Sequence, residues 1–258
     1  MADRELLNIL AKQEDLFRDL AESGAYSNEE DRFRRIQDLV TDYNRFLVDN
    51  PDNLYALILY GKLLRTVGKD DTAYYVFLRA DAIDSEIAVV HQHIGNYLAE
   101  RGAFAEALAR LKKAIELSPE TALYHYQFGL FLSRYRDALV EKGLYDRAEI
   151  DAHMLEAFEQ AAKLEPENRD FQFRYAEAFY DVVEPDWNRA LEIWEALQST
   201  AQYERETAAI TLHRAKVLSA MGRYPEARRL AESVEDPALE LSRKALLEEI
   251  DVLASPSQ

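Results

Sequence analysis

Cysteine is absent from the 258-residue chain, which excludes disulfide bonds, thiolate metal sites and cysteine nucleophiles together. Glycine and proline are scarce, at 8 and 7 residues, so long flexible linkers and many tight β-turns are not expected. The longest uninterrupted apolar run, Leu54–Tyr60, has seven residues, far short of the roughly 20 that a membrane-spanning helix needs. The charged opening Met-Ala-Asp-Arg-Glu does not fit a secretory signal. We therefore expect a cytoplasmic protein without a membrane partner.

Positive charge is also in short supply. The chain has 31 Lys and Arg residues against 48 Asp and Glu residues, a net charge of −17. Such a surface repels phosphate backbones and anionic lipids at long range, so neither nucleic acid nor a membrane is an expected partner. Hydrophobic residues make up 48% of the chain, which is enough for a sizeable core.

Residues 88–121 show the pattern around which the rest of the chain is organised. They predict two short amphipathic helices separated by a turn at Gly102. In the second helix, Ala107, Leu111 and Ala114 lie on one stripe, at the spacings that a helix requires. A helical hairpin of this length cannot bury its own apolar stripe, so it needs a neighbour on each side.

Corresponding residues recur every 34 positions. The aligned sets are Gly61, Gly95 and Gly129; Gly68 and Gly102; Ala73 and Ala107; Phe77 and Leu111; and Ala80 and Ala114. In this period, and in its small residues where two helices cross, the chain resembles the tetratricopeptide repeat family. The resemblance covers nearly the whole chain and is clearest in residues 54–121. Gly and Ala let two helix axes approach closely, while Phe77 or Leu111 fills the space beside them.

The resemblance implies an all-α fold: a right-handed superhelix of about five helical hairpins with a C-terminal capping helix. The chain then divides into an N-terminal long hairpin at 1–53, a repeat array at 54–236, and a capping helix with a loose tail at 237–258. The copies in the array are 54–87, 88–121, 122–168, 169–202 and 203–236. In the N-terminal hairpin, Ser27 and Glu30 predict a capping box at the start of the second helix.

The third copy is longer than the others. Gly143 follows Gly129 by 14 residues, where the corresponding glycines of the two earlier copies are 7 residues apart, and the following helix gains a similar length. Seven added residues are about two helical turns, so both helices of this hairpin are predicted to extend beyond their neighbours by roughly 10 Å. The alternative is a drifted repeat with one long loop.

In this family the first helix of each repeat faces a concave groove that holds a segment of a partner protein. Assigning those positions by the repeat selects Tyr55, Lys62, Arg65, Gln92, His93, Asn96, Tyr126, Gln127, Arg134, Phe173, Arg174, Glu177, Tyr180, His213 and Lys216. The set holds five Lys or Arg against one Glu, although the whole chain has an excess of acid. A basic, aromatic groove predicts an acidic or carboxylate-bearing partner segment, unless the excess reflects ordinary surface composition.

Some members of the family bind the C-terminal carboxylate of chaperones through a clamp of Lys, Asn and Arg side chains. Asn96 and Arg174 fall on matching places here. Gln92, Gln127 and Asp170 depart from the clamp, and Asp170 would repel the carboxylate. Binding of chaperone tails is therefore not expected.

We predict a non-catalytic scaffold or adaptor that binds a peptide or helix of a partner protein, with no cofactor, metal or catalytic residue. No phosphate-binding loop, nucleophile elbow or zinc signature is present in the sequence. One alternative is a structural subunit or assembly factor that acts through self-association or its convex face. A hydrolase with a site in the groove has only His93 and His213, near acidic residues, as support. His91 and His125 lie one period apart, where the family packs a bulky side chain, so a structural role is expected for them.

Overall fold

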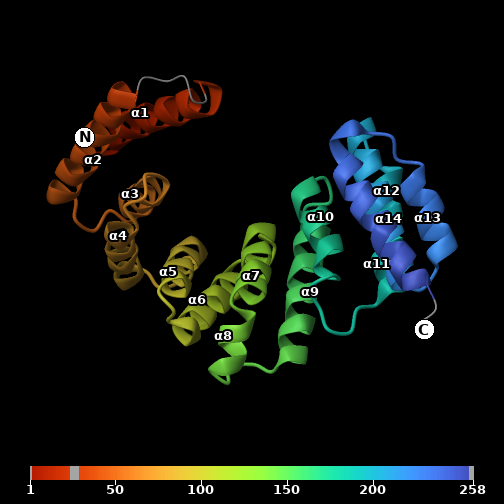
Figure 1. Ribbon diagram of the computed structural model, residues 1–258. Coiled ribbons are helices and arrows are strands. Elements are labelled where there is room, and N and C mark those ends of the chain that lie inside the picture. Colours follow the sequence, from red (N-terminus) through yellow and green to blue (C-terminus); the bar gives the residue numbers. More distant parts are fainter. Residues whose placement is uncertain (1, 24–28, 256–258) are drawn as a thin grey trace. The chain divides into compact units, whose positions relative to one another are not determined.

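The computed structural model describes residues 2–23 and 29–255, and all regular elements in these ranges are helices (Figure 1). The predicted all-α fold, built from helical hairpins, is confirmed. None of the helices in these ranges is long and apolar enough to cross a membrane. The chain divides into two compact units, Met1–Pro119 and Glu120–Gln258, each of which has its own succession of hairpins.

The described part of the first unit contains three hairpins, in which each helix packs against the next one along the chain. The helices are α1 (Ala2–Ser23), α2 (Glu29–Asp49), α3 (Leu54–Thr66), α4 (Asp70–Ile83), α5 (Ala88–Glu100) and α6 (Phe104–Leu117). Tyr43 of α2 stacks on Tyr60 of α3 with ring centroids 5.2 Å apart, which joins the N-terminal hairpin to the first repeat. Ser27 of the predicted capping box lies outside the described residues.

Local signals set the ends of these helices. At the start of α3, the side-chain oxygen of Asn53 accepts a hydrogen bond from the backbone N–H of Ala56 (2.9 Å). Gly68 and Gly102 follow α3 and α5 with φ of +73° and +78°, a left-handed conformation that L side chains rarely adopt. The predicted turn at Gly102 is therefore confirmed.

The helix crossings of the first unit are closed by glycine. A Cβ atom on Gly61 would lie 2.6 Å from Cζ of Phe77, and one on Gly95 would lie 2.9 Å from Cγ of Leu111. Both distances are well below van der Waals contact, so only a residue without a side chain fits at these crossings. The predicted pairing of a small residue with a bulky one is confirmed.

The second unit continues the hairpin pattern. Its elements are α7 (Ala122–Arg134), α8 (Arg136–Glu141), α9 (Arg147–Leu164), α10 (Arg169–Ala178), α11 (Trp187–Ser199), α12 (Glu204–Ala220), α13 (Tyr224–Glu232), η2 (Pro237–Leu239) and α14 (Glu240–Ala254). The hairpins pair α7 with α9, α10 with α11, and α12 with α13. The last helix, α14, packs against both α12 and α13 through Leu246 and Ile250. The end of the predicted loose tail, residues 256–258, lies outside the described residues.

The third repeat differs from the prediction in two ways. Its first helix is not a single lengthened helix, because α7 ends at Arg134 and a break at Tyr135 separates it from the short α8. The second helix, α9, has 18 residues against 14 in α6, a gain of about one turn rather than two. The alternative of one long loop is also wrong, because α8 takes up most of the added residues.

A buried acidic residue holds this irregular region together. Oδ1 of Asp151, on α9, lies 3.4 Å from Nε of Arg136 and 3.5 Å from Nε of Arg147. Its other oxygen accepts a hydrogen bond from the backbone N–H of Val183 (2.9 Å), in the connection between α10 and α11. One carboxylate thus joins α8, α9 and the connection between α10 and α11.

The crossing at Gly61 can be tested with one methyl group. Gly61→Ala should lower the free energy of unfolding by about 1–3 kcal/mol through overpacking, although Ala favours a helix over Gly by about 1 kcal/mol. In a Phe77→Ala background the same substitution should be neutral or stabilising, since the ring that it meets has gone. Urea unfolding followed by circular dichroism measures both. An equal loss in the two backgrounds would contradict the crossing as the cause.

Asp151→Ala should cost about 3 kcal/mol, because it leaves the buried guanidinium of Arg136 without a counter-charge. The control is Asp137→Ala, which removes a carboxylate from a side chain that is 98% exposed. That change should cost less than about 1 kcal/mol. If the two variants unfold at the same urea concentration, the buried ion cluster does not stabilise the third repeat.

Candidate partner-binding surface

The predicted groove residues lie on the first helices of the hairpins: α3 and α5 in the first unit, and α7, α10 and α12 in the second. Tyr180 lies two residues after the end of α10. Gln92 is only 4% exposed, so the prediction that it contacts a partner is wrong. Its side chain points about 100° around the helix axis from that of the neighbouring His93, and this direction is towards the core. We call the remaining predicted residues the first-helix face of each unit.

In the first unit, His93 of α5 lies against the bulky residue of the preceding hairpin. Its ring stacks on Phe77, with centroids 4.5 Å apart and an interplanar angle of 13°. Burial, followed by the nearby charges of Lys62 and Arg65, lowers the pKa of His93 to about 4. His93 is therefore neutral at pH 7 and adds a flat polar surface rather than a positive charge.

The two basic residues beside His93 differ in their partners. Arg65 donates hydrogen bonds to Asp70 (2.8 Å) and Glu100 (3.0 Å), so its charge is neutralised within the unit. Lys62 is exposed and makes no ion pair with the described residues. Tyr55, one residue into α3, is 60% exposed, and Asn96 is half-buried. The accessible part of this face thus combines one unpaired cation with an exposed aromatic ring.

The second unit has a matching cluster around a buried tryptophan. His213 of α12 stacks on Trp194, with centroids 4.1 Å apart and an interplanar angle of 7°, and Phe173 meets Trp194 edge-on at 5.5 Å. The Tyr180 ring lies 5.9 Å from that of His213, and the Lys216 ammonium lies 4.4 Å from the centroid of Tyr180. Burial, followed by the charge of Lys216, lowers the pKa of His213 to about 4. Burial also raises the pKa of Tyr180.

Arg174 is held inside the second unit. Its guanidinium lies 4.4 Å from the centroid of Phe158 and donates to Asp181 (2.8 Å) and Ser133 (3.0 Å). Like Arg65, it is charged but already paired.

The other predicted residues of this unit range from packed to exposed. Tyr126 lies 4.6 Å from the ring of Phe171 and packs against a buried apolar cluster. Gln127 and Glu177 are half-buried, and Arg134 at the end of α7 is exposed. Tyr126 therefore serves the core more than the surface.

Three junctions between hairpins share one arrangement. In each, a planar side chain lies on the first helix of a hairpin, two residues before the small residue at that helix's crossing. It packs on the bulky aromatic residue from the second helix of the preceding hairpin. The pairs are His93 on Phe77, Arg174 on Phe158, and His213 on Trp194. The residues that the period assigned to a groove are thus also the ones that join successive hairpins.

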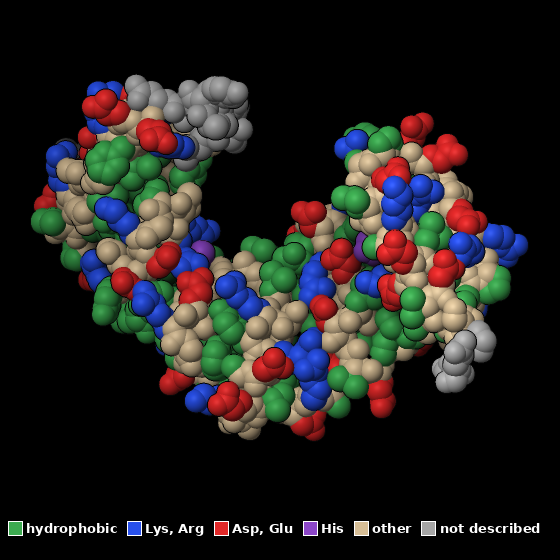
Figure 2. Space-filling model, in the orientation of Figure 1, with side chains coloured by type: hydrophobic (Ala, Val, Ile, Leu, Met, Phe, Trp, Pro, Cys, Tyr) green, Lys and Arg blue, Asp and Glu red, His purple; other side chains and the backbone are tan. Residues whose placement is uncertain are grey.

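Two apolar residues of this surface were missed. Leu123 and Leu130 of α7 are 43% and 37% exposed. They stand two periods after Tyr55 and Lys62, so the 34-residue period could have found them, but the residues were selected for polar or aromatic chemistry. Figure 2 shows hydrophobic side chains exposed over α7.

His91 has the structural role that was expected. Its Nε2 lies 2.7 Å from the backbone oxygen of Ser85, and its Nδ1 lies 3.0 Å from Nη1 of Arg110, which also donates to Asp81 (2.8 Å). Nδ1 thus accepts from Arg110, and Nε2 donates to Ser85. Within the described residues, no group of three or more His, Asp or Glu side chains is placed to hold a metal ion.

The geometry defines a class of protein: an array of helical hairpins in which a small residue of the first helix meets a bulky residue of the second, as Gly61 meets Phe77 and Gly129 meets Phe158. A family model described as TPR repeat matches residues 95–133. Protein IFIT1 homolog B of Homo sapiens is 32% identical over 82 residues, which are 31% of this chain and 17% of that protein. The chain therefore spans only a small part of this relative's length.

Solved structures with the same fold are more extensive matches. The Pseudomonas aeruginosa pilF structure has a TM-score of 0.60 at 17% identity, covering 97% of this chain and 98% of that one. YrrB, described as a TPR protein with an unusual peptide-binding site, has a TM-score of 0.59 at 17% identity, covering 79% of this chain and 97% of that one. With the repeat match at residues 95–133 and the observed crossings, these similarities show that the chain has the tetratricopeptide repeat fold.

The stacked histidines predict a loss of stability in acid. Because the folded pKa of His93, about 4, lies below the usual 6.5, folding favours the neutral ring. The contribution of the neutral His93 ring to the free energy of unfolding is complete above pH 6.5 and is lost as the pH falls towards 4. Between pH 7 and pH 5 the free energy of unfolding should fall by about 1–2 kcal/mol more in the natural chain than in His93→Gln. Urea unfolding at the two pH values measures this difference.

The control is His153→Gln, which removes an exposed histidine of α9. It should leave the pH dependence as it is in the natural chain. If His93→Gln also leaves it unchanged, protonation of the stacked ring is not what weakens the fold in acid.

Proposed function

We propose that this tetratricopeptide repeat protein is a non-catalytic scaffold that binds an acidic segment of a partner protein on its first-helix faces. The observation that carries the proposal is the state of the exposed cations. Lys62, Arg134 and Lys216 make no ion pair with the described residues, whereas Arg65 and Arg174 do. Unpaired cations on an otherwise acidic chain are available to an incoming carboxylate.

Apolar and aromatic residues supply the contact area beside these charges. Tyr55, Leu123 and Leu130 are exposed on the same first helices. Exposed aromatic and aliphatic side chains are typical anchors of protein interfaces, with charges at the rim setting rate and selectivity. We assign Arg65 and Arg174 the role of holding the face in place, in contrast to the first expectation that all five basic residues set charge preference.

The family supports the same proposal. Tetratricopeptide repeat proteins are typically scaffolds without catalytic activity, and the structurally similar YrrB is described as having a peptide-binding site. A peptide ligand for this chain follows from that likeness together with its own exposed cations. The proposal assigns no catalytic residue.

Charge reversal tests the proposal. Lys62→Glu with Lys216→Glu should slow the association of acidic, leucine-containing peptides by roughly tenfold, because steering depends on unpaired surface charge. The matched control, Lys69→Glu with Lys142→Glu, makes the same change in net charge at the hairpin turns and should have a much smaller effect. Stopped-flow fluorescence at low and physiological salt measures both. The proposal fails if natural protein binds acidic and neutral peptides equally, or if the two double variants are equally slow.

A further inference from the structure

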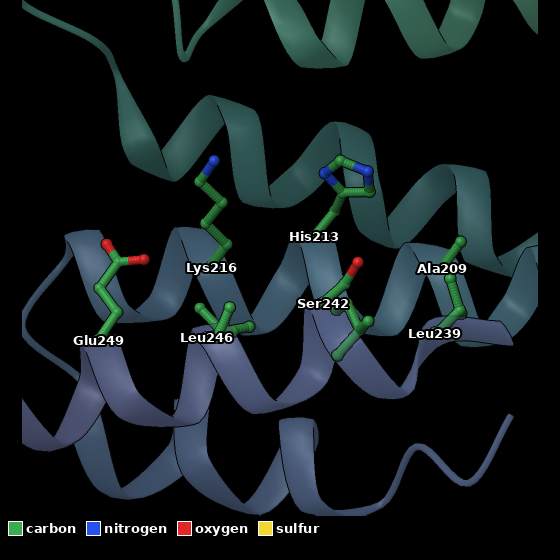
Figure 3. Close-up of a pocket in the computed structure, with 9 residues that line it drawn as sticks. Ala209, His213, Lys216, Leu239, Ser242, Leu246 and Glu249 are labelled. Atoms are coloured by element: carbon green, nitrogen blue, oxygen red, sulfur yellow. The ribbon is translucent and has the colours of Figure 1, made fainter. Parts of the chain in front are cut away.

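A pocket of ≈ 320 Å³ lies between α12 and α14 (Figure 3). Leu212 of α12, Leu239 of η2 and Leu246 of α14 form the apolar part of its walls. It opens beside His213 and Lys216, which belong to the first-helix face of the second unit. This volume is at the lower end of the range for ligand pockets and leaves room for a large side chain.

The crossing of the hairpin beside the pocket differs from the earlier ones. In α4, α6 and α11, the bulky residue at the helix crossing is Phe77, Leu111 and Trp194, respectively. In α13 the same position holds Ala231, which is fully buried in one apolar cluster with Leu246 of α14. The helix α14 packs against α12 as well as α13, and a recess lies between α12 and α14.

Opposite charges stand on the two walls. Lys216 rises from α12 and Glu249 from α14 at the same end of the pocket (Figure 3). Both side chains are exposed, and neither makes an ion pair with the described residues. An acidic residue of a ligand is attracted to the α12 wall, and a basic one to the α14 wall.

We infer that this pocket receives a large apolar side chain of a bound partner peptide, flanked by an acidic residue at Lys216 and a basic residue at Glu249. The inference rests on the proposed function and deepens it, because it names the sequence that the second unit selects. The last helix is then part of the binding surface as well as a cover for the end of the array. An apolar residue supplies the buried area, and the charged neighbours supply selectivity.

The test uses fluorescein-labelled Gly/Ser peptides with one central triplet: Glu-Leu-Lys, Glu-Ser-Lys or Glu-Leu-Glu. Fluorescence anisotropy with the full chain should rank Glu-Leu-Lys first, with about tenfold weaker binding when Leu becomes Ser.

Ala245→Phe, which fills the pocket from an exposed position, should weaken Glu-Leu-Lys binding by about tenfold. Ala105→Phe, also at an exposed position but on α6, should not. Glu249→Lys should shift the preference to Glu-Leu-Glu.

A second readout does not depend on affinity. Because the chain has no cysteine, Ala245→Cys introduces a single thiol at the pocket. Saturating Glu-Leu-Lys peptide should slow its alkylation by iodoacetamide about tenfold, with no effect on the thiol of Ala105→Cys. An unprotected thiol, or binding that ignores the Leu-to-Ser change, overturns the inference. If acidic peptides then still bind through Lys62 and Lys216, the proposed function stands without the pocket. If no acidic peptide binds, the proposed function and the pocket inference both fail.

Discussion

The close crossing of two helices at a glycine is the contact on which the rest of the structure depends. At Gly61 the backbone of α3 meets the tip of the Phe77 ring, since Cζ and both Cε atoms are the nearest neighbours of an added Cβ. The face of the same ring carries His93 of the next hairpin. Phe77 therefore packs within its own hairpin through the tip of its ring and against the next hairpin through the face of its ring. A substitution at Phe77 changes both contacts at once.

This double use explains how charge is distributed over the first-helix face. His93 and His213, which stack on Phe77 and Trp194, are neutral at pH 7 because burial removes the water that would solvate an imidazolium. The arginines are paired, because a planar guanidinium can stack on a ring and bind a carboxylate at once, as Arg174 does with Phe158 and Asp181. The compact, strongly hydrated ammonium of lysine suits an exposed position better. Lys62 and Lys216 therefore remain as accessible positive charge.

The sequence was sufficient for what the 34-residue period carries. Small residues at the crossings, their bulky partners and the turn glycines recur at fixed intervals, and Gly143 takes the expected left-handed conformation even in the lengthened repeat. The break at Tyr135 was not predictable in this way. It is held by Asp151, whose partner Val183 is 32 residues away and belongs to the next hairpin, and no local pattern reports such a contact.

The candidate surface was only partly predictable, for a related reason. A period specifies which turn of a helix faces a groove, but adjacent residues differ by about 100°, so Gln92 was assigned to the surface together with its neighbour His93. The exposed Leu123 and Leu130 are aliphatic, so a selection by polar or aromatic chemistry does not include them. Their spacing is that of the surface stripe, and spacing was the better guide to exposure than residue type.

In the last hairpin, the helix crossing lacks the bulky residue that the earlier crossings have. Ala215 and Ala231 are both fully buried, so the last hairpin closes without an aromatic platform on which a further helix could rest. The α14 helix instead brings its own large side chains, Leu246 and Ile250, and packs against α12 as well as α13. These two side chains share one apolar cluster with Leu212 and Leu218 of α12. A helix attached in this way can terminate the array while leaving a recess beside the surface that the first helices share.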